Sequence, residues 1–166
     1  MEKFNIFVIN STVTILDILY RDRDIQRFWV LEEIARAPYF AFLSVLHLKE
    51  SLGLRGDQHI ILMKVHFEQT LNETEHLEYM ESLGGNNRLI DRLFARGLVL
   101  FYYWAMVLYY LISPKNAYHI NMEVERHAAL TYTKYLAHTP SEMIEKILND
   151  EIMHYNELKK SMEIFK

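Results

Sequence analysis

The residues best suited to chemistry are two pairs of glutamate and histidine with the same spacing, Glu73–His76 and Glu151–His154. Residues three positions apart share one face of an α-helix, so each pair can present a carboxylate and an imidazole to the same point. Four-helix bundles with a di-iron carboxylate centre use this pair twice, together with one further glutamate from each of two other helices. A chain rich in glutamate also produces such spacings by chance, so the pairs alone are a weak signal.

The positions of the glutamates relative to the turns strengthen the metal hypothesis. Glu125 and Glu151 lie at similar distances on either side of the turn at Thr139–Pro140, so an antiparallel helical hairpin brings them to one level. Glu32 and Glu73 flank an earlier glycine-containing loop in a comparable, less symmetric way. Buried carboxylates are costly unless neutralised, and two divalent cations would neutralise all of them. Glutamate and histidine without thiolate suit iron or manganese better than zinc or copper(I).

A simpler interpretation of Glu73 and His76 is a solvated helix face. Glu75, Glu78 and Glu81 follow on the same segment, and charged residues of this kind usually face water. The spacing by itself allows both interpretations.

The elements that position these residues are predicted to be long helices in one all-α domain. The chain has 166 residues, and its 5 glycines and 3 prolines allow few turns. We interpret residues 1–166 as a single domain, with an N-terminal helix or arm at 1–23 and a helical bundle at 24–163. Ser141 is expected to cap the last helix, and Pro38 is expected to kink the second. The predicted helices span residues 11–20, 24–52, 58–83, 88–112, 117–137 and 141–163.

Composition excludes several classes of function. The chain contains no cysteine, which excludes a disulfide framework, a zinc–thiolate site, an iron–sulfur cluster and a cysteine nucleophile. The net charge of −4 gives no reason to expect nucleic acid as a partner.

The segment Gly97–Ser113 carries no charged side chain. Its apolar part, Leu98–Ile112, is about 22 Å long as a helix, which is shorter than the ~30 Å hydrocarbon core of a bilayer. One interpretation is a buried central helix. The other is a helix lying in one leaflet with its aromatic residues at headgroup level, among them Tyr102, Tyr103, Tyr109 and Tyr110. Pro38–Leu46 is similarly apolar, and the two segments together would form a one-sided membrane platform.

The motifs that surround these residues resemble the alternative oxidase family, and in particular its plastid terminal oxidase branch. The resemblance covers about residues 20–155 and includes every metal-binding motif in order. The segments that carry it are Tyr20–Asp24, Val30–His47, Lys64–Phe67, Asn72–Leu77, Met80–Asn86, Phe101–Trp104, Ser113–Lys115, Val124–Ala128 and Asp150–His154.

The resemblance implies a ferritin-like four-helix di-iron carboxylate bundle with additional membrane-surface helices. It implies a quinol:oxygen oxidoreductase that oxidises quinol, plastoquinol or ubiquinol, and reduces O2 to water without pumping protons. It also implies a homodimer attached to one leaflet of a thylakoid or bacterial cytoplasmic membrane. The implied ligands of two non-haem iron ions are Glu32, Glu73, His76, Glu125, Glu151 and His154.

Further residues take roles from the same resemblance. Tyr132 matches the family's redox tyrosine and lies two helical turns after Glu125, on the same helix face. Without the resemblance, a core tyrosine with a hydrogen-bonded hydroxyl would be the simpler interpretation. The remaining implied residues are the quinol contacts Arg27 and Thr131, and the partners Asn72 and Asp150 that orient ligands.

This chain departs from the family pattern at several positions. Glu33 stands where the family has threonine, and Leu148 where it usually has arginine. His127 replaces an acidic residue of the mitochondrial branch, which fits the plastid branch. The segment between Glu125 and Glu151 is also much shorter than in the plastid enzymes.

Two other functions are consistent with the same residues. A di-iron quinone-ring hydroxylase would use similar glutamate and histidine pairs at a membrane and would yield a hydroxylated ring. A non-enzymatic helical bundle at a membrane surface would bind a partner through residues 98–112 and would contain no stoichiometric iron.

Overall fold

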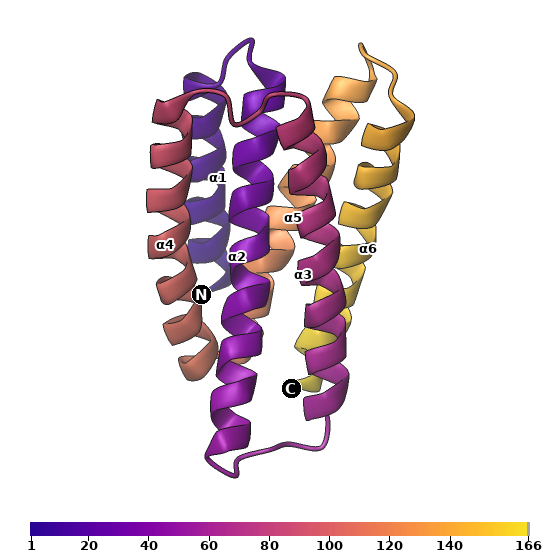
Figure 1. Ribbon diagram of the computed structural model, residues 1–166. Helices are drawn as coiled ribbons and strands as arrows, with labels where there is room; N and C mark the ends of the chain where they lie inside the picture. The colour runs from indigo at the N-terminus through magenta and orange to yellow at the C-terminus, as the bar shows by residue number, and fades with distance from the viewer. Residues whose placement is uncertain (166) are drawn as a thin grey trace.

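The computed structural model describes residues 1–165, which form six α-helices and no strand. The helices run up and down in sequence, each antiparallel to the one before it (Figure 1). They are α1 (Glu2–Leu19), α2 (Asp24–Ser51), α3 (His59–Ser82), α4 (Leu89–Ile112), α5 (Pro114–Leu136) and α6 (Glu142–Ile164).

A four-helix bundle of α2, α3, α5 and α6 forms the centre of the molecule. Helix α2 packs against α3 and α5, and α6 packs against α5 and α3. Helices α1 and α4 lie together beside α2 and α5, on the opposite side from α3 and α6 (Figure 1). The predicted all-α bundle with two additional helices is therefore confirmed.

Most predicted helix boundaries agree with the structure to within one residue, and two do not. Helix α1 begins at Glu2 instead of residue 11, because the apolar start of the chain continues the helix without a cap. Helix α5 begins at Pro114, so only Ser113 separates it from α4 where the sequence predicted a longer loop. Proline is well tolerated at the first helical position, where no hydrogen bond from its nitrogen is needed.

Local features fix the ends of two helices. The Ser141 side chain accepts a hydrogen bond from the Ile144 nitrogen at the start of α6, as predicted. At the end of α3, Gly84 has a φ of +85°, a conformation that favours glycine. A Cβ on the next residue, Gly85, would lie 2.5 Å from Trp29 Cβ, so this glycine lets the loop rest on α2. Helix α2 continues through Pro38.

The apolar core consists of two clusters, and both draw on α2 and α5. One contains Phe28, Trp29 and Tyr132, near the end of the bundle where α2 begins. The other contains Phe42, Tyr110 and Tyr118, toward the α2–α3 loop. Between these clusters lie Glu32 of α2 and Glu125 of α5, the most deeply buried glutamates of the two helices.

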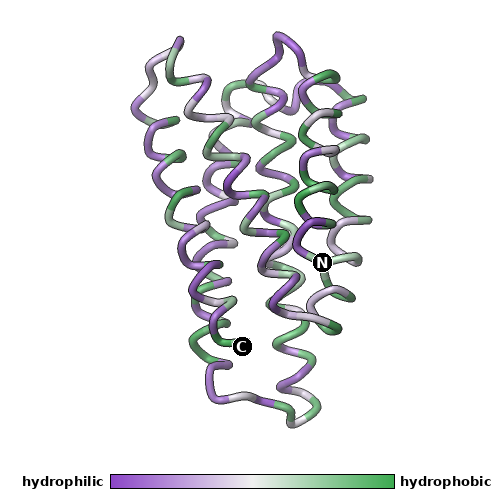
Figure 2. Tube along the Cα trace, turned by 180° about the vertical axis from the view of Figure 1, so that it is seen from behind, coloured by the Kyte–Doolittle hydropathy of each residue, from purple (hydrophilic) through white to green (hydrophobic). Residues whose placement is uncertain are grey.

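An extensive apolar surface lies on α1 and α4, whose apolar residues are visible from behind in Figure 2. Helix α4 is long and apolar enough to cross a membrane by length and composition, and only 17% of its apolar window is buried. The interpretation of α4 as a buried central helix is therefore wrong. Large apolar residues exposed on the two helices include Phe4, Phe7, Ile15 and Ile18 on α1 and Ile90, Leu100, Phe101, Trp104, Leu108 and Ile112 on α4.

Two details of the predicted membrane platform are wrong. Most of Pro38–Leu46 is buried in the bundle, with Tyr39, Ala41 and Phe42 at 0% exposure, so α1 takes the place of this segment on the surface. The tyrosines of α4, which were predicted to lie at the headgroup level of the membrane, are also more buried in the protein than this prediction implied. Tyr110 is fully buried, while Phe101 and Trp104 point outward with 74% and 58% exposure.

Candidate metal centre

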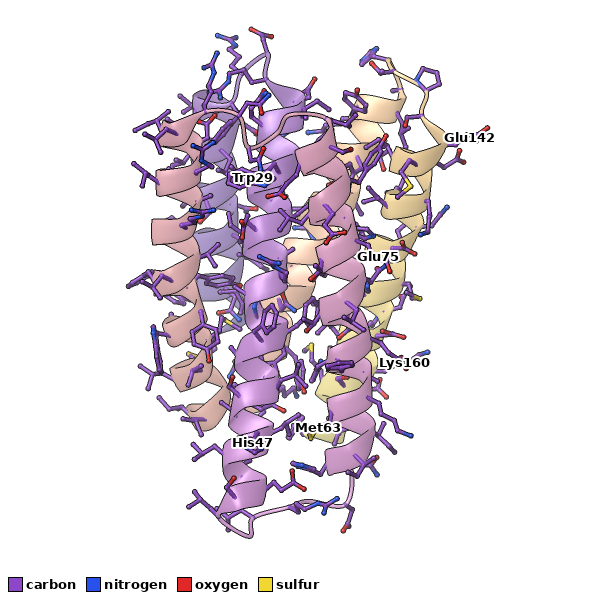
Figure 3. The ribbon with its side chains drawn as sticks, viewed as in Figure 1. Trp29, His47, Met63, Glu75, Glu142 and Lys160 are labelled. Carbon is purple, nitrogen blue, oxygen red and sulfur yellow. The ribbon has the colours of Figure 1, made fainter. Side chains whose placement is uncertain are left out.

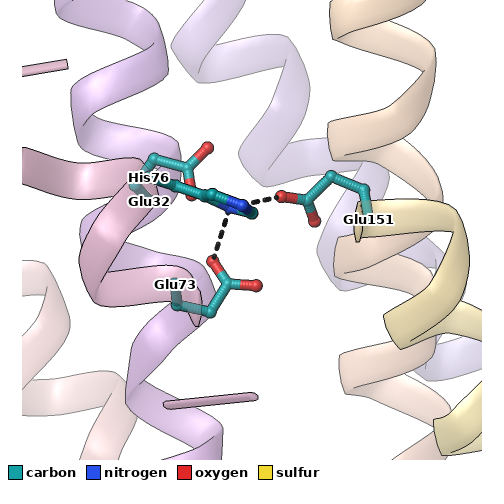
Figure 4. Close-up of side chains that lie close together, drawn as sticks. All are labelled: Glu32, Glu73, His76 and Glu151. Carbon is teal, nitrogen blue, oxygen red and sulfur yellow. Dashed lines mark ion pairs between the residues drawn. The ribbon is translucent and has the colours of Figure 1, made fainter. Parts of the chain in front are cut away.

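Six acidic and histidine side chains meet in the middle of the four-helix bundle, and all of them are at most 1% exposed. Each of the four bundle helices contributes to the cluster. Helices α2 and α5 supply one glutamate each, and α3 and α6 each supply a Glu-x-x-His pair. Figure 4 shows four of these residues converging from α2, α3 and α6. The six are Glu32, Glu73, His76, Glu125, Glu151 and His154.

The solvated-face interpretation of α3 applies to other residues of that helix. Glu75, Glu78 and Glu81 are exposed, and Glu75 is labelled on α3 in Figure 3. Glu73 and His76 point inward, because positions three apart share the face that α3 turns toward α2 and α6.

Close approaches within the cluster leave little space between opposing groups. His76 Nδ1 lies 3.5 Å from Glu32 Oε2 and 3.3 Å from Glu151 Oε1. His154 Nδ1 lies 2.8 Å from Glu73 Oε1. The cluster therefore presents nitrogen and oxygen atoms from four helices to a common centre.

The donor atoms divide into two groups that share two glutamates. In each group, the potential ligand atoms lie within 4.8 Å of one another. Glu73 and Glu151 belong to both groups, so each of them could help to hold two ions. One group is completed by Glu32 and His76, and the other by Glu125 and His154.

The unpaired atoms of this cluster fit metal ions. Within residues 1–165, both carboxylate oxygens of Glu73 and of Glu151 are buried without a hydrogen-bond partner, as are both ring nitrogens of His154. Buried polar groups in native proteins almost always have a hydrogen-bond partner or a bound ion. So many buried atoms without a hydrogen bond in one place therefore indicate a binding site for metal ions. Oxygen and imidazole ligands without thiolate suit iron or manganese.

Burial and mutual repulsion shift the ionisation of the cluster. Burial raises the pKa of Glu73 and Glu151 well above the usual range, and the neighbouring carboxylates raise it further. Burial also raises the pKa of Glu125. Burial by itself lowers the pKa of His76, but Glu32 and the other carboxylates around it raise this pKa to about 9. Without metal, the cluster therefore holds protons that two cations would displace.

Two tyrosines donate hydrogen bonds to the two glutamates that are not shared. The Tyr132 hydroxyl, predicted to lie near the site, donates to Glu32 Oε1. The Tyr39 hydroxyl donates to Glu125 Oε1 at 2.5 Å. Sequence reasoning missed Tyr39, although it follows Glu32 by the same two helical turns that separate Tyr132 from Glu125.

Asp150 and Asn72 lie beside His76, as expected for residues that orient a ligand. Asp150 Oδ2 is 3.1 Å from His76 Nε2, which leaves Nδ1 of that ring facing the carboxylates. Asn72 Nδ2 donates to the same Asp150 oxygen at 3.3 Å. The aspartate thereby fixes both the tautomer and the ring orientation of His76.

A sequence profile described as alternative oxidase matches residues 1–163. This chain belongs to the alternative oxidase family. It is 48% identical over 141 residues to "Ubiquinol oxidase 4, chloroplastic/chromoplastic" of Arabidopsis thaliana, covering 84% of this chain and 39% of the relative. It is 32% identical to "Alternative oxidase 3, mitochondrial" of Glycine max, over 79% of this chain and 39% of the relative.

A third relative, "Ubiquinol oxidase, mitochondrial" of Mangifera indica, is 29% identical over 89% of this chain and 45% of its own length. The chain thus spans less than half the length of these curated relatives. The higher identity to the chloroplast protein supports the plastid branch of the alternative oxidase family. No solved structure matches the chain.

The predicted quinol contacts of this alternative oxidase chain lie near the metal centre but outside it. Arg27 Nη2 is 3.4 Å from Thr131 Oγ1 and forms an ion pair with Asp17 of α1 at 2.5 Å. Arg27 precedes Glu32 by five residues on α2, about one and a half turns, and Thr131 directly precedes Tyr132 on α5. They line a pocket that also contains Lys134.

An apolar cavity of about 140 Å³ lies between α1, α2, α4 and α5. Its wall includes Leu31 and Val124, the residues adjacent in sequence to Glu32 and Glu125. Tyr102 also lines it, and within the described part of the chain its hydroxyl is buried without a hydrogen-bond partner. Burial and the nearby Glu125 carboxylate raise the pKa of Tyr102, so this hydroxyl stays protonated at neutral pH and can donate a hydrogen bond.

The side chains that depart from the family pattern do not belong to the two ligand groups. Glu33 forms an ion pair with Arg36 on its own helix at 3.0 Å. Leu148 packs at the edge of an apolar cluster. His127 lines the cavity next to α1, where it is 3.0 Å from Asn10 Oδ1.

The remaining histidines differ in their distance from the centre. His47 and His138 are exposed, and His119 is hydrogen-bonded to Asn5 of α1. His59 is buried near Glu50, at the far end of the bundle. His66 alone of this group packs near the cluster, with its ring centroid 6.1 Å from that of Tyr39.

Proposed function

We propose that this alternative oxidase chain is a membrane-bound quinol oxidase that uses two iron ions to reduce O2 to water. The observation that carries the proposal is the pair of ligand groups sharing Glu73 and Glu151. Two iron ions, when bound, supply the site of O2 binding and the storage of electrons taken from quinol. The names of the relatives, ubiquinol oxidase and alternative oxidase, support the same reaction.

The protein supplies a dry and fixed ligand set. Glu32, Glu73, His76, Glu125, Glu151 and His154 hold the two ions, and Asp150 holds the ring of His76 in place. Complete burial excludes bulk water, which protects reactive oxygen species from unwanted protons and strengthens every electrostatic contact.

Quinol reaches this centre from the lipid through the cavity beneath α1 and α4. The cavity wall is mostly apolar, which suits the quinol ring and its prenyl tail. Because the Tyr102 hydroxyl has no hydrogen-bond partner within the described residues, it is available to bind an oxygen atom of the quinol ring. Arg27 and Thr131 lie one helical turn beyond the cavity and orient a hydroxyl group of the quinol ring. Arg27 reaches this hydroxyl group when its ion pair with Asp17 opens.

Tyr132 provides the proton and electron step nearest to the metal ions. Its hydroxyl already donates to Glu32, and its ring is 0% exposed and packed against Phe28. A phenol held in this way can give up an electron and a proton together without moving. The nearby quinol then restores both.

Attachment to one leaflet follows from the exposed apolar residues of α1 and α4. These helices lie side by side, so their outer faces enter the interface together and do not need to cross it (Figure 1). We propose a thylakoid-type or bacterial cytoplasmic membrane, with the homodimer of the family as the assembled form. Plastoquinol is the proposed substrate because the chloroplast relative is the most similar of the three compared.

The test combines metal analysis with O2 uptake. Purified protein loaded with ferrous iron should bind two irons per chain and consume O2 with plastoquinol or ubiquinol analogues, in the presence of cyanide. Glu73→Ala and Glu151→Ala should lose iron and activity together. Glu75→Ala, on the exposed face of α3, is the matched control and should retain both.

The products separate this proposal from the alternatives. An oxidase yields quinone and water in stoichiometric amounts, whereas a hydroxylated quinone ring would indicate the hydroxylase. Iron content and turnover that survive in Glu73→Ala or Glu151→Ala would refute the ligand assignment. Protein that binds no iron at all would indicate a non-enzymatic bundle.

A further inference from the structure

A chain of buried hydrogen bonds lies beside the metal centre and has no part in the proposed reaction. The Tyr110 hydroxyl is 2.9 Å from the Tyr118 hydroxyl, and the Tyr118 hydroxyl is 2.7 Å from His66 Nε2. His66 Nδ1 is 3.1 Å from Gln69 Oε1. All of these side chains are at most 2% exposed, and none belongs to the ligand set.

The direction of these hydrogen bonds is set from the surface inward. Gln69 Nε2 donates to Glu157 Oε2 at 2.9 Å, so the amide oxygen of Gln69 faces His66. Nδ1 of His66 must then carry the hydrogen, which leaves the Nε2 lone pair as an acceptor for the Tyr118 hydroxyl. Burial lowers the pKa of His66 to about 4, so the imidazole is neutral at physiological pH, and its Nε2 lies 2.7 Å from the Tyr118 hydroxyl as the hydrogen-bond acceptor.

Tyr39 connects this chain to the metal centre. Its hydroxyl donates to Glu125 Oε1 at 2.5 Å, and its ring centroid lies 5.9 Å from that of His154. On the other side, the same ring is 6.1 Å from His66, which itself stacks on Tyr118 at 5.4 Å. Aromatic rings therefore follow one another without a gap from a proposed iron ligand to Tyr118.

We propose that Tyr118 is a redox-active tyrosine that gives one electron to the oxidised metal centre when no quinol is bound, with His66 as its proton acceptor. This inference rests on the proposed oxidase function, which supplies O2 as the oxidant. The O–H bond of Tyr118 breaks, its proton moves to His66 Nε2, and its electron passes by way of Tyr39 to the centre. A neutral phenoxyl radical and an imidazolium ion result.

Recovery reverses these transfers. Of the two electrons that the next quinol gives up, one passes through the centre to the Tyr118 radical and the other stays at the centre, while the proton returns from His66 to the phenol oxygen. The Tyr110 hydroxyl donates to the Tyr118 oxygen throughout, which stabilises the radical. No atom is lost, and the centre gains one reducing equivalent at a time when the substrate is absent.

Tyr118 differs from Tyr132 in its proton acceptor. Tyr132 donates to Glu32, which serves as a metal ligand in the proposed site and is a poor base once it is bound to a cation. Tyr118 donates to Nε2 of a neutral imidazole that lies outside the proposed ligand set. We therefore assign the short-lived transfer of an electron and a proton during turnover to Tyr132, and a longer-lived tyrosyl radical to Tyr118.

Freeze-quench electron paramagnetic resonance (EPR) tests this assignment. Iron-loaded protein is reduced chemically, freed of excess reductant and mixed with O2 in the absence of quinol. Wild-type protein should give a tyrosyl signal that narrows when the tyrosine rings are deuterated. Tyr118→Phe should lose most of this signal while keeping its iron. Tyr155→Phe, a half-buried tyrosine of the same apolar cluster, is the matched control and should keep it.

A second variant separates proton transfer from packing. In His66→Gln, the amide oxygen still accepts the Tyr118 hydrogen bond but cannot take the proton, so the radical signal should be lost with helix content and iron intact. A tyrosyl signal unchanged in both variants would overturn the inference and leave the oxidase function standing. O2 consumption without any tyrosyl signal would overturn it as well, and failure to bind iron would overturn both proposals.

Discussion

The Tyr39 hydroxyl of α2 donates a hydrogen bond to Glu125 of α5, and the Tyr132 hydroxyl of α5 donates one in the opposite direction to Glu32 of α2. Helices α2 and α5 each carry a glutamate followed two turns later by a tyrosine. Because the helices are antiparallel, each tyrosine reaches the glutamate of the other helix (Figure 1). Each unshared glutamate therefore has one oxygen held by a phenol and one left for a metal ion.

Replacing Tyr132 by Phe tests its role in O2 reduction. The variant removes one oxygen atom and little volume, so helix content, iron and quinol affinity should be close to wild type. Turnover should fall about a hundredfold or more, because a positioned proton donor is lost. O2 uptake and iron analysis on the same sample decide the outcome. Near wild-type O2 uptake would make the hydroxyl only a buried hydrogen-bonding group, and loss of iron would make it structural.

Asp150→Asn tests the orientation of His76. The amide can no longer accept charge-assisted hydrogen bonds from His76 and Asn72, so iron affinity should weaken by about 10- to 100-fold. Competition with a coloured chelator measures this change. Asp57→Asn in the exposed α2–α3 loop is the control, and equal affinities in the two variants would contradict the proposed contact.

The metal-free protein should lose stability as the pH rises from about 6.5 to 9. The raised pKa values of Glu73 and Glu151, and that of His76 at about 9, mean that the folded state retains protons which the unfolded state releases. His66 and His154 have lowered pKa values and are neutral in both states above about pH 6.5, so they add nothing there.

Thermal unfolding in chelator measures this dependence. Added Mn²⁺ should raise the unfolding temperature most at the high end of the range, since cations replace the protons of the cluster. A metal-free protein that becomes more stable between these pH values would contradict the assignment of the buried carboxylates.

Membrane attachment through α4 is tested by replacing Phe101 and Trp104 with serine. These are among the most exposed large apolar residues of the helix, so the variant should sediment with liposomes much less than wild type. Ile61 is an exposed residue of α3, away from α1 and α4, so Ile61→Ser is the control and should bind liposomes as wild type does. Protease cleavage at Gly84–Asn87 from one side of sealed vesicles, and near Ser113 from the other, would instead show a helix that crosses the membrane.

Much of the site was predictable because the Glu-x-x-His spacing and the turns place ligands independently of side-chain packing. Tyr39 was not predicted, because its role depends on how α2 and α5 cross. Pro38–Leu46 was misplaced for a related reason. An uncharged segment has the same composition whether it faces lipid or a protein core, and only tertiary contacts distinguish the two. The early start of α1 was missed because no capping residue marks it.

A single residue, Ser113, joins the most apolar helix, α4, to α5, which carries Glu125. So short a joint cannot act as a hinge, and the Tyr109 hydroxyl fastens the last turn of α4 to Asn5 of α1. In the proposed membrane-bound form, the depth of α4 in the lipid would therefore set the height of Glu125 above the bilayer. In that form, the lateral pressure within the leaflet would act directly on the distance between a quinol in the lipid and the proposed metal centre.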